Sequence, residues 1–483
     1  MGESKLKLNI KRTITVGLAF MTITMFWQVY DNLMPLMLRE MGFSETLRGL
    51  VMAADNIIAL LLLPFMGLWS DNLSGRIRDK FGRRMPFIVV GSLLAAFFFL
   101  LVNFSYNMAV KGEEVSTVWL AIMLVTTAFL LISMCLYRTP SVALMPDVTP
   151  KQIRSQGNTV INIMGTVGGL IPTVLMMFKV FLKTETIPTG EMITVWDSAT
   201  HGYVTRPETV VRLTGNNWLL VGLIAALMAI ATLVLVLKVN ENKFVEEKKR
   251  LLEDYGLVED ENEENAQEKI SIKEGLKSLD KGQRKSLLFI LLSVALWYFA
   301  YNGVTSHFSA FALDVLKMES FSIALIVAQA AAFIFFVPAS KIGEKIGRKK
   351  TVMIGVSLMI AGFGLGSILL YAVKDVELLK YIMYPVFVLV GAGWATINVH
   401  SFVMSVEMAS ERTTGVFTGL YYSFSMGAQI ITPILAGACM EFIDSRSLLV
   451  YSTVFCVLAL ITMSFVRHGN AGDTTKIKEE VNG

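Results

Sequence analysis

The sequence is poor in charge. Only 17% of its 483 residues are Asp, Glu, Lys or Arg, whereas a soluble domain carries about a quarter. Hydrophobic residues make up 54% of the chain, and apolar runs of roughly 20 residues recur along it, each long enough to cross a hydrocarbon core of about 30 Å. The sequence therefore predicts twelve membrane-spanning helices, with the lipid bilayer as the first partner.

Residues and motifs of covalent and redox chemistry are also scarce. The three cysteines, Cys135, Cys439 and Cys456, all fall in apolar runs, where a structural disulfide is not expected. There is no nucleotide-binding loop, no His-Glu-x-x-His metal motif and no Gly-x-Ser-x-Gly nucleophile motif. We therefore expect no enzyme activity, no metal and no cofactor, and no nucleic-acid partner.

The positive charge that is present lies in alternate connections between the runs. Lys and Arg gather at the N-terminus, at 76–84, around Arg154, at 238–285 and at 341–350. Cationic loops resist translocation, so this distribution predicts cytoplasmic termini. The first run is too long for a secretory signal and should remain as a span. We expect a multi-pass protein of the cell membrane, with the short tails typical of bacteria, acting as a monomer.

Two segments of the chain repeat each other. PASKIGEKIGRKKTVMIG at 338–355 follows the eighth run much as PFMGLWSDNLSGRIRDKFGRRMPFI at 64–88 follows the second, and Asp147 and Glu407 occupy matching positions further along. This pattern indicates a duplicated six-helix unit. The predicted fold is all-α, with two pseudo-symmetric six-helix bundles at 1–238 and 286–467, a solvated cytoplasmic linker at 239–285 and a cytoplasmic tail at 468–483.

This duplication, with a Gly, an acid and Gly-Arg-Arg after the second helix, resembles the major facilitator superfamily. SDNLSGRIRDKFGRRMPFI at 70–88, with its longer interval before Gly-Arg-Arg, is similar to the sucrose transporters and the wider glycoside-pentoside-hexuronide:cation symporters. YRTPSVALMPDVTPKQIRSQGN at 137–158 and GVFTGLYYSFSMGAQIITPI at 415–434 resemble the same group. The resemblance implies symport of a sugar or glycoside with a proton, by rocking of the two bundles.

The same resemblance implies a gate at the cytoplasmic side, where acids and arginines bridge helices and stabilise one state of the carrier. The positions that match are Gly67, Asp71, Gly82, Arg83 and Arg84, with Asp147 and Arg154 as partners. The plainer alternative is that these basic residues only set the topology. Arg138, near the expected end of the fourth span, fits an interfacial snorkelling role at least as well as contact with substrate.

Acids inside the apolar runs need a reason, since a charge at mid-bilayer costs on the order of 3 kcal/mol. Asp31 follows Thr24 and Gln28 at helical spacing, and Asp55 falls at a similar depth in the second run. Burial and a neighbouring carboxylate both favour the protonated form of a carboxyl group. Our hypothesis is that Asp31, assisted by Asp55, binds the coupling proton. The alternative is that both acids hydrogen-bond to neighbouring helix ends.

Two departures from the resembled families bear on the coupling ion. Melibiose-type symporters carry two aspartates on the second helix close before its proline, whereas here Asp55 stands alone and well before Pro64. Plant sucrose transporters place an acid in the fourth helix, and the run at 119–137 has none. From the first departure we expect a proton rather than sodium, and from the second we expect the coupling site to lie elsewhere than in the fourth helix.

Sugar binding requires hydrogen-bonding groups beside an aromatic face. Residues of both kinds recur at helical spacing in several runs, although each one alone is more often a packing residue. The predicted substrate-binding set is Gln28, Asn158, Asn162, Trp297, Tyr301, Asn302, Trp394, Asn398, Tyr422 and Gln429. His307 and His400 are expected to be hydrogen-bonded helix residues rather than a proton relay, and the long external loop at 183–217 is expected to form a small lid or hairpin.

Two other functions remain open. Abundant Met and Phe would suit an exporter of amphipathic compounds, and a carrier fold with a cytoplasmic linker would also suit a sensor that does not transport.

Overall fold

The computed structural model describes residues 8–112, 114–150, 153–197, 202–213, 217–255, 272–408 and 413–468. The middle of the predicted linker, 256–271, and all but the first residue of the predicted tail at 468–483 lie outside the described residues.

Within that part of the chain, twelve helices are long and apolar enough to cross a membrane, which confirms the predicted fold class. They are α1 (Ile10–Glu40), α2 (Glu45–Asp71), α4 (Met85–Ala109), α5 (Thr117–Val148), α6 (Arg154–Met176), α7 (Trp218–Lys238), α11 (Lys281–Asp314), α12 (Phe321–Ile346), α13 (Arg348–Ala372), α15 (Tyr384–Val406), α16 (Thr414–Phe442) and α17 (Ser447–Ser464).

The chain divides into two compact units. The first comprises Met1–Gly42, Ala54–Glu185 and Leu213–Asn262, and the second comprises Phe43–Ala53, Thr186–Arg212 and Glu263–Gly483. The beginning of α2 thus belongs to the second unit and the rest of that helix to the first. The sequence-based boundaries at 238, 285 and 467 remain predictions.

In the first unit, small residues let helices pack closely. A Cβ at Gly91 of α4 would lie 2.7 Å from the Tyr137 Cβ of α5, so these two helices meet without an intervening side chain. Ser92 shares a 2.8 Å hydrogen bond with Thr232, which joins α4 to α7. A cluster of buried apolar side chains then fills the space between helices: Val16, Ala19, Met85, Ile88, Leu144, Met145, Val148, Ile161, Leu235 and Val239.

Small residues also allow close helix packing in the second unit. A Cβ at Gly355 of α13 would lie 2.9 Å from the Gly393 carbonyl of α15. Ser293 of α11 donates to the Ala459 carbonyl of α17 at 2.9 Å. Hydroxyl bonds of this kind satisfy polar side chains where lipid supplies no partner.

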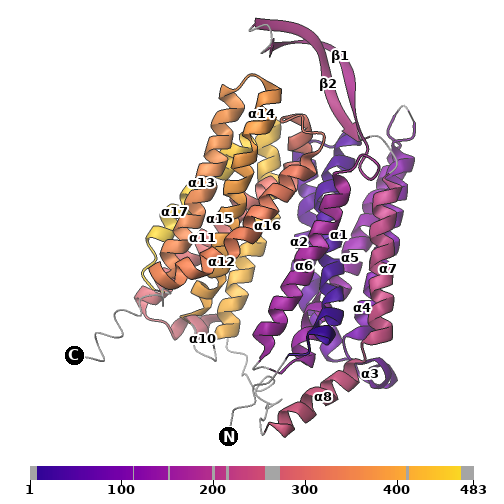
Figure 1. Ribbon diagram of the computed structural model, residues 1–483, viewed down its shortest axis with the longest axis vertical. Helices are drawn as coiled ribbons and strands as arrows, with labels where there is room; N and C mark the ends of the chain where they lie inside the picture. The colour runs from indigo at the N-terminus through magenta and orange to yellow at the C-terminus, as the bar shows by residue number, and fades with distance from the viewer. Residues whose placement is uncertain are drawn as a thin grey trace, which may run out of the picture. The chain divides into compact units, whose positions relative to one another are not determined.

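Shorter elements lie at the ends of the long helices. They are α3 (Arg76–Phe81), α8 (Glu241–Asp254), α10 (Ile272–Lys277), α14 (Val376–Ile382) and the paired strands β1 (Thr184–Asp197) and β2 (Gly202–Leu213). Figure 1 shows β1 and β2 as one long hairpin, so the hairpin expected in the 183–217 loop is confirmed. Thr186 donates to Glu319 at 2.9 Å, which ties the hairpin to the connection between α11 and α12.

Candidate functional site: a charged network and a pair of intramembrane acids

The turn before α4 depends on glycine. Gly82 has φ 90°, a left-handed conformation that other residues adopt only at a cost. A Cβ at this position would overlap the carboxylate of Glu241. Pro86 stands in the first turn of α4, where its missing N–H costs nothing. The sequence therefore fixes both the turn and the start of the helix that follows.

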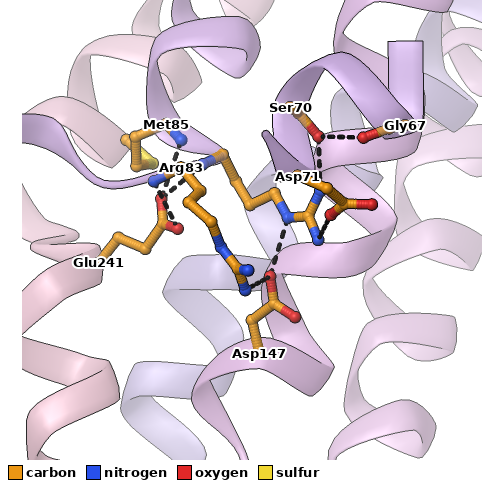
Figure 2. A network of polar contacts seen from close by, with 8 residues as sticks. Gly67, Ser70, Asp71, Arg83, Met85, Asp147 and Glu241 are labelled. Carbon is orange, nitrogen blue, oxygen red and sulfur yellow. Dashed lines mark hydrogen bonds and ion pairs between the residues drawn. The ribbon is translucent and has the colours of Figure 1, made fainter. Parts of the chain in front are cut away.

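Arg84, directly after this turn at the start of α4, bonds to residues of α2 and α5, and Figure 2 labels its partners Ser70, Asp71 and Asp147. Its guanidinium group lies 2.5 Å from an Asp71 carboxylate oxygen of α2 and 2.8 Å from the Asp147 Oδ2 of α5. It also donates to the Ser70 hydroxyl at 2.5 Å. Arg84 is only 6% exposed, so these charge-assisted bonds are weakly screened. The structure thus joins Asp71, Arg84 and Asp147, three residues that the family resemblance placed at one gate.

Glu241, the first residue of α8, completes the network. Its carboxylate accepts backbone N–H groups of Arg83, Arg84 and Met85 at 2.9, 2.8 and 3.0 Å (Figure 2). The first N–H groups of a helix have no partner within it, and a negative charge suits their dipoles. Burial raises the pKa of Glu241 above its usual range, although the three N–H donors act in the opposite direction.

The rest of α8 is bonded to the same unit, and Figure 1 shows α8 beside α3. Asn242 donates to the Arg78 and Asp79 carbonyls of α3, each at 3.0 Å. The Arg12 guanidinium of α1 lies 3.4 Å from Glu247 and 5.0 Å from the centre of the Phe244 ring. The beginning of the predicted linker is therefore docked rather than only solvated. Sequence reasoning missed Glu241 because charge alone does not reveal docking; the apolar face of α8 was the available signal.

The other residues of the predicted gate take more peripheral places. Arg83 lies 3.5 Å from Asp147. A Cβ at Gly67 would meet the Thr139 methyl group at 3.3 Å, so this glycine permits close approach of α2 to α5. Arg154 donates to the Thr149 carbonyl at 3.3 Å, near the start of its own helix.

The second repeat carries a simpler pairing. Gly347 repeats the turn with φ 89°. Arg348 lies 2.6 Å from Glu407, and Lys349 donates to the carbonyls of Ser464 and Val466 at 2.8 and 2.7 Å.

Asp31 and Asp55 lie near each other within the first unit, as the depth argument predicted. Each is partly buried, and the two carboxyl groups are within electrostatic range of one another. Arg138 of α5 acts on both of them, and its guanidinium lies 5.9 Å from the Trp27 ring. Because α5 continues to Val148, Arg138 is not at a helix end. Arg138 therefore lies beside the two acids, and its snorkelling role stays a prediction.

The predicted substrate residues divide into accessible and buried ones. In the second unit, the rings of Tyr301 and Trp394 stack with centroids 5.8 Å apart, and both are partly accessible. The amides of Asn302 and Asn398 donate to carbonyls one turn earlier in their own helices. Trp297 departs from the expectation: it is 0% exposed and stacks on Tyr298, so it packs rather than faces a solute in this conformation.

The remaining predicted substrate residues lie on three helices. Gln28 is partly accessible on α1, and its backbone carbonyl accepts from Asn32 at 2.9 Å. Asn158 and Asn162 are exposed on α6. On α16, Tyr422 is 53% exposed, and Gln429 donates to the Ser425 carbonyl at 3.2 Å.

Comparison with known proteins identifies the family. The model of the Major Facilitator Superfamily matches residues 16–429. The chain belongs to this superfamily. With twelve candidate membrane-spanning helices among its described residues, it is an integral membrane protein.

Among curated relatives, this superfamily member is 28% identical over 118 residues to sucrose transport protein SUC3 of Arabidopsis thaliana, covering 24% of the chain and 18% of that protein. It is 32% identical over 136 residues to proton-associated sugar transporter A of Mus musculus, covering 27% and 17%. The matched segments therefore span less than a fifth of either relative.

Solved structures match over nearly the whole chain. Nucleoside transporter NupG aligns with a TM-score of 0.60 at 15% identity, covering 95% of this chain and all of that one. A bacterial homologue of the iron transporter ferroportin in an inward-facing state aligns with a TM-score of 0.63 at 12% identity, covering 96% and 100%. At such identities the likeness concerns the fold alone.

Proposed function

We propose that this transporter carries a sugar or glycoside together with a proton, by alternating access of its two halves. It would act in the cell membrane with both termini in the cytoplasm, the arrangement that the distribution of Lys and Arg favours. The proposal depends above all on one observation, the grouping of Asp31, Asp55 and Arg138 on three spanning helices of one unit.

The charge count of this group favours a proton. Two carboxylates and one guanidinium sum to one negative charge, and a single proton makes the group neutral. An uncompensated charge away from water is costly, so the group can gain a proton when its surroundings become drier and lose it when water returns. Such a cycle is what coupling to a proton gradient requires.

Sodium is the less suitable ion. Hard cations prefer several oxygen ligands, and this group offers two carboxyl groups beside an arginine. Arg138 beside both acids would also repel a second cation.

The substrate class is supported by side-chain chemistry and by the partial matches to sugar transporters. The stacked Tyr301 and Trp394 rings offer an apolar face, and the amides of Asn302 and Asn398 lie on the same two helices. A sugar has a C–H face for the rings and hydroxyl groups for the amides.

Reconstituted vesicles with an imposed pH gradient test the proposal. A panel of sugars and glycosides should reveal one solute that accumulates against its gradient in wild-type vesicles. Asp31→Asn should abolish this accumulation while solute exchange between the two sides continues, since exchange needs no net proton movement. Asp444→Asn is the matched control, because Asp444 is an exposed carboxylate outside the spans.

Unchanged uphill uptake in Asp31→Asn would overturn the coupling role. Efflux of amphipathic compounds without any sugar uptake would favour the exporter, and binding without flux would favour the sensor.

A further inference from the structure

The first residues of α2 pack tightly within the second unit. A Cβ at Gly49 would overlap the Pro433 carbonyl of α16, and a Cβ at Gly437 would overlap the Glu45 carbonyl. The Thr46 N–H donates to Glu441 of α16 at 2.9 Å. The backbones of α2 and α16 are therefore in direct contact. Charged side chains within this packing lie close to one another.

His307 of α11 is buried in the same packing and is 1% exposed. Its Nε2 lies 2.8 Å from the Pro433 carbonyl oxygen, and its Nδ1 lies 3.6 Å from Glu45 Oε2. A carbonyl oxygen and a carboxylate both only accept hydrogen bonds, whereas a neutral imidazole has one donor and one acceptor nitrogen. Each contact has a donor when both nitrogens of the His307 ring carry a proton. The same holds when the ring is neutral and the additional proton is on the Glu45 carboxyl group.

The charges around the pair are compatible with that additional proton. Arg48 forms an ion pair with Glu45 from one turn further along α2, and Glu441 stands exposed at the edge of α16. The carboxylates of Glu45 and Glu441 thus lie around the guanidinium of Arg48. A positively charged imidazole at His307 makes the net charge of the four groups zero. Tyr451 of α17, which approaches α11 at Gly303, and Cys439 of α16 are of types that are neutral near pH 7.

We propose that His307 and Glu45 form a proton-binding site, and that the bound proton stabilises the packing of Phe43–Ala53 against α11 and α16. When this segment leaves, the imidazole loses its carboxylate partner and the extra proton is released. The site is separate from Asp31 and Asp55 and goes beyond the proposed function, although the segment that carries Glu45 continues along α2 into Asp55.

His400 offers a matched control within the same unit. It is also buried, at 6% exposed, and its Nε2 lies 3.0 Å from the Ala339 carbonyl. A neutral imidazole that donates from Nε2 satisfies this bond. His400 therefore needs no additional proton.

The test is a distance measurement between spin labels on the full-length protein in lipid nanodiscs. Labels at Leu47 and Ile443, which are 49% and 74% exposed, report on the separation of the start of α2 from the end of α16, after replacement of the three native cysteines. The short-distance population should fall as pH rises, with the ratio of short to long distances changing at most about tenfold per pH unit for one proton.

His307→Gln and Glu45→Gln should each remove this pH dependence, whereas His400→Gln should keep it. Retention of the wild-type slope in His307→Gln, or its loss in His400→Gln as well, would overturn the proposal. Asp31→Asn separates the two proposals, because it should abolish uphill uptake, whereas adding His307→Gln to it should still lower the remaining pH dependence of the distance. Monodisperse elution of each variant shows that it has folded.

Discussion

Gly82 and Gly347 occupy the same turn in the two halves of the chain, with φ 90° and 89°, yet the charges around them differ. Arg84 reaches Asp71, Asp147 and Ser70 and is almost entirely buried. Among the described residues of the matching turn, Arg348 pairs with Glu407, and its side chain is 30% exposed. The duplication thus preserved the backbone and not the network.

The difference shows where the extra partners come from. Asp71 and Ser70 lie at the end of α2, before the longer interval that leads to Gly82, and Glu241 comes from the linker. The segment from Pro338 to Gly347 is nine residues shorter than the one from Pro64 to Gly82. The network at the first turn also includes Glu241, which lies outside the repeated six-helix unit.

The largest loss of stability is expected from Arg84→Ala. This substitution removes the cation beside Asp71 and leaves Asp147 only with the more distant Arg83. Loss of one partner from a buried pair costs about 3–5 kcal/mol, and we expect the lower end, since Asp71 is 48% exposed. Denaturant titration in detergent measures the loss of stability. Arg83→Ala is the control and should cost much less, because Arg83 is 38% exposed and 3.5 Å from Asp147.

A second test removes the carboxylate contributed by the linker. Glu241→Ala should cost about 1–3 kcal/mol, because three N–H groups, those of Arg84 and Met85 buried and that of Arg83 partly so, lose their acceptor. Glu241→Gln should cost less, since the amide oxygen still accepts. A midpoint of unfolding for Glu241→Ala that matches the wild type would show that α8 does not support the turn.

The raised pKa of Glu241 adds a pH test. An acid whose folded pKa exceeds its unfolded value, about 4.3, contributes most stability below that value, and the contribution is lost as pH rises through the folded pKa. Wild-type stability should therefore fall relative to that of Glu241→Gln as pH rises from about 4. A constant difference between the two proteins across this range would contradict the pKa direction.

The smallest effect is expected from Arg348→Ala. A partly exposed pair contributes about 0–1 kcal/mol and is screened by salt. The loss should shrink further in about 1 M salt, whereas that of Arg84→Ala should persist. A loss as large as that of Arg84→Ala would mean that the two turns depend on charge to the same extent.

Local patterns made much of this molecule predictable. Apolar run lengths predicted the twelve spans, and the resemblance of one motif to the major facilitator superfamily implied that Arg84 and Asp147 belong to one network. Counting helical rise placed Asp31 and Asp55 at similar depths, and the structure brings them together. Each of these inferences uses information within one helix or one motif.

The rest depends on packing between distant segments. Glu241 resembles any solvated linker carboxylate until α8 docks beside α4. Arg138 looked terminal because the helix end was estimated from hydropathy, and α5 extends to Val148. His307 meets Glu45 only because the start of α2 joins the second unit.

The docking of α8 also bears on how the protein can be divided. Fragments of a duplicated carrier are usually cut between the repeats, which here would suggest a cut after Lys238. A fragment ending there would expose the amides at the start of α4. It would also lack Asn242 and Glu247, so that the Arg78 carbonyl and Arg12 would lose these contacts. For coexpression of separate halves, the N-terminal piece should extend beyond Asp254, so that it includes the whole of α8.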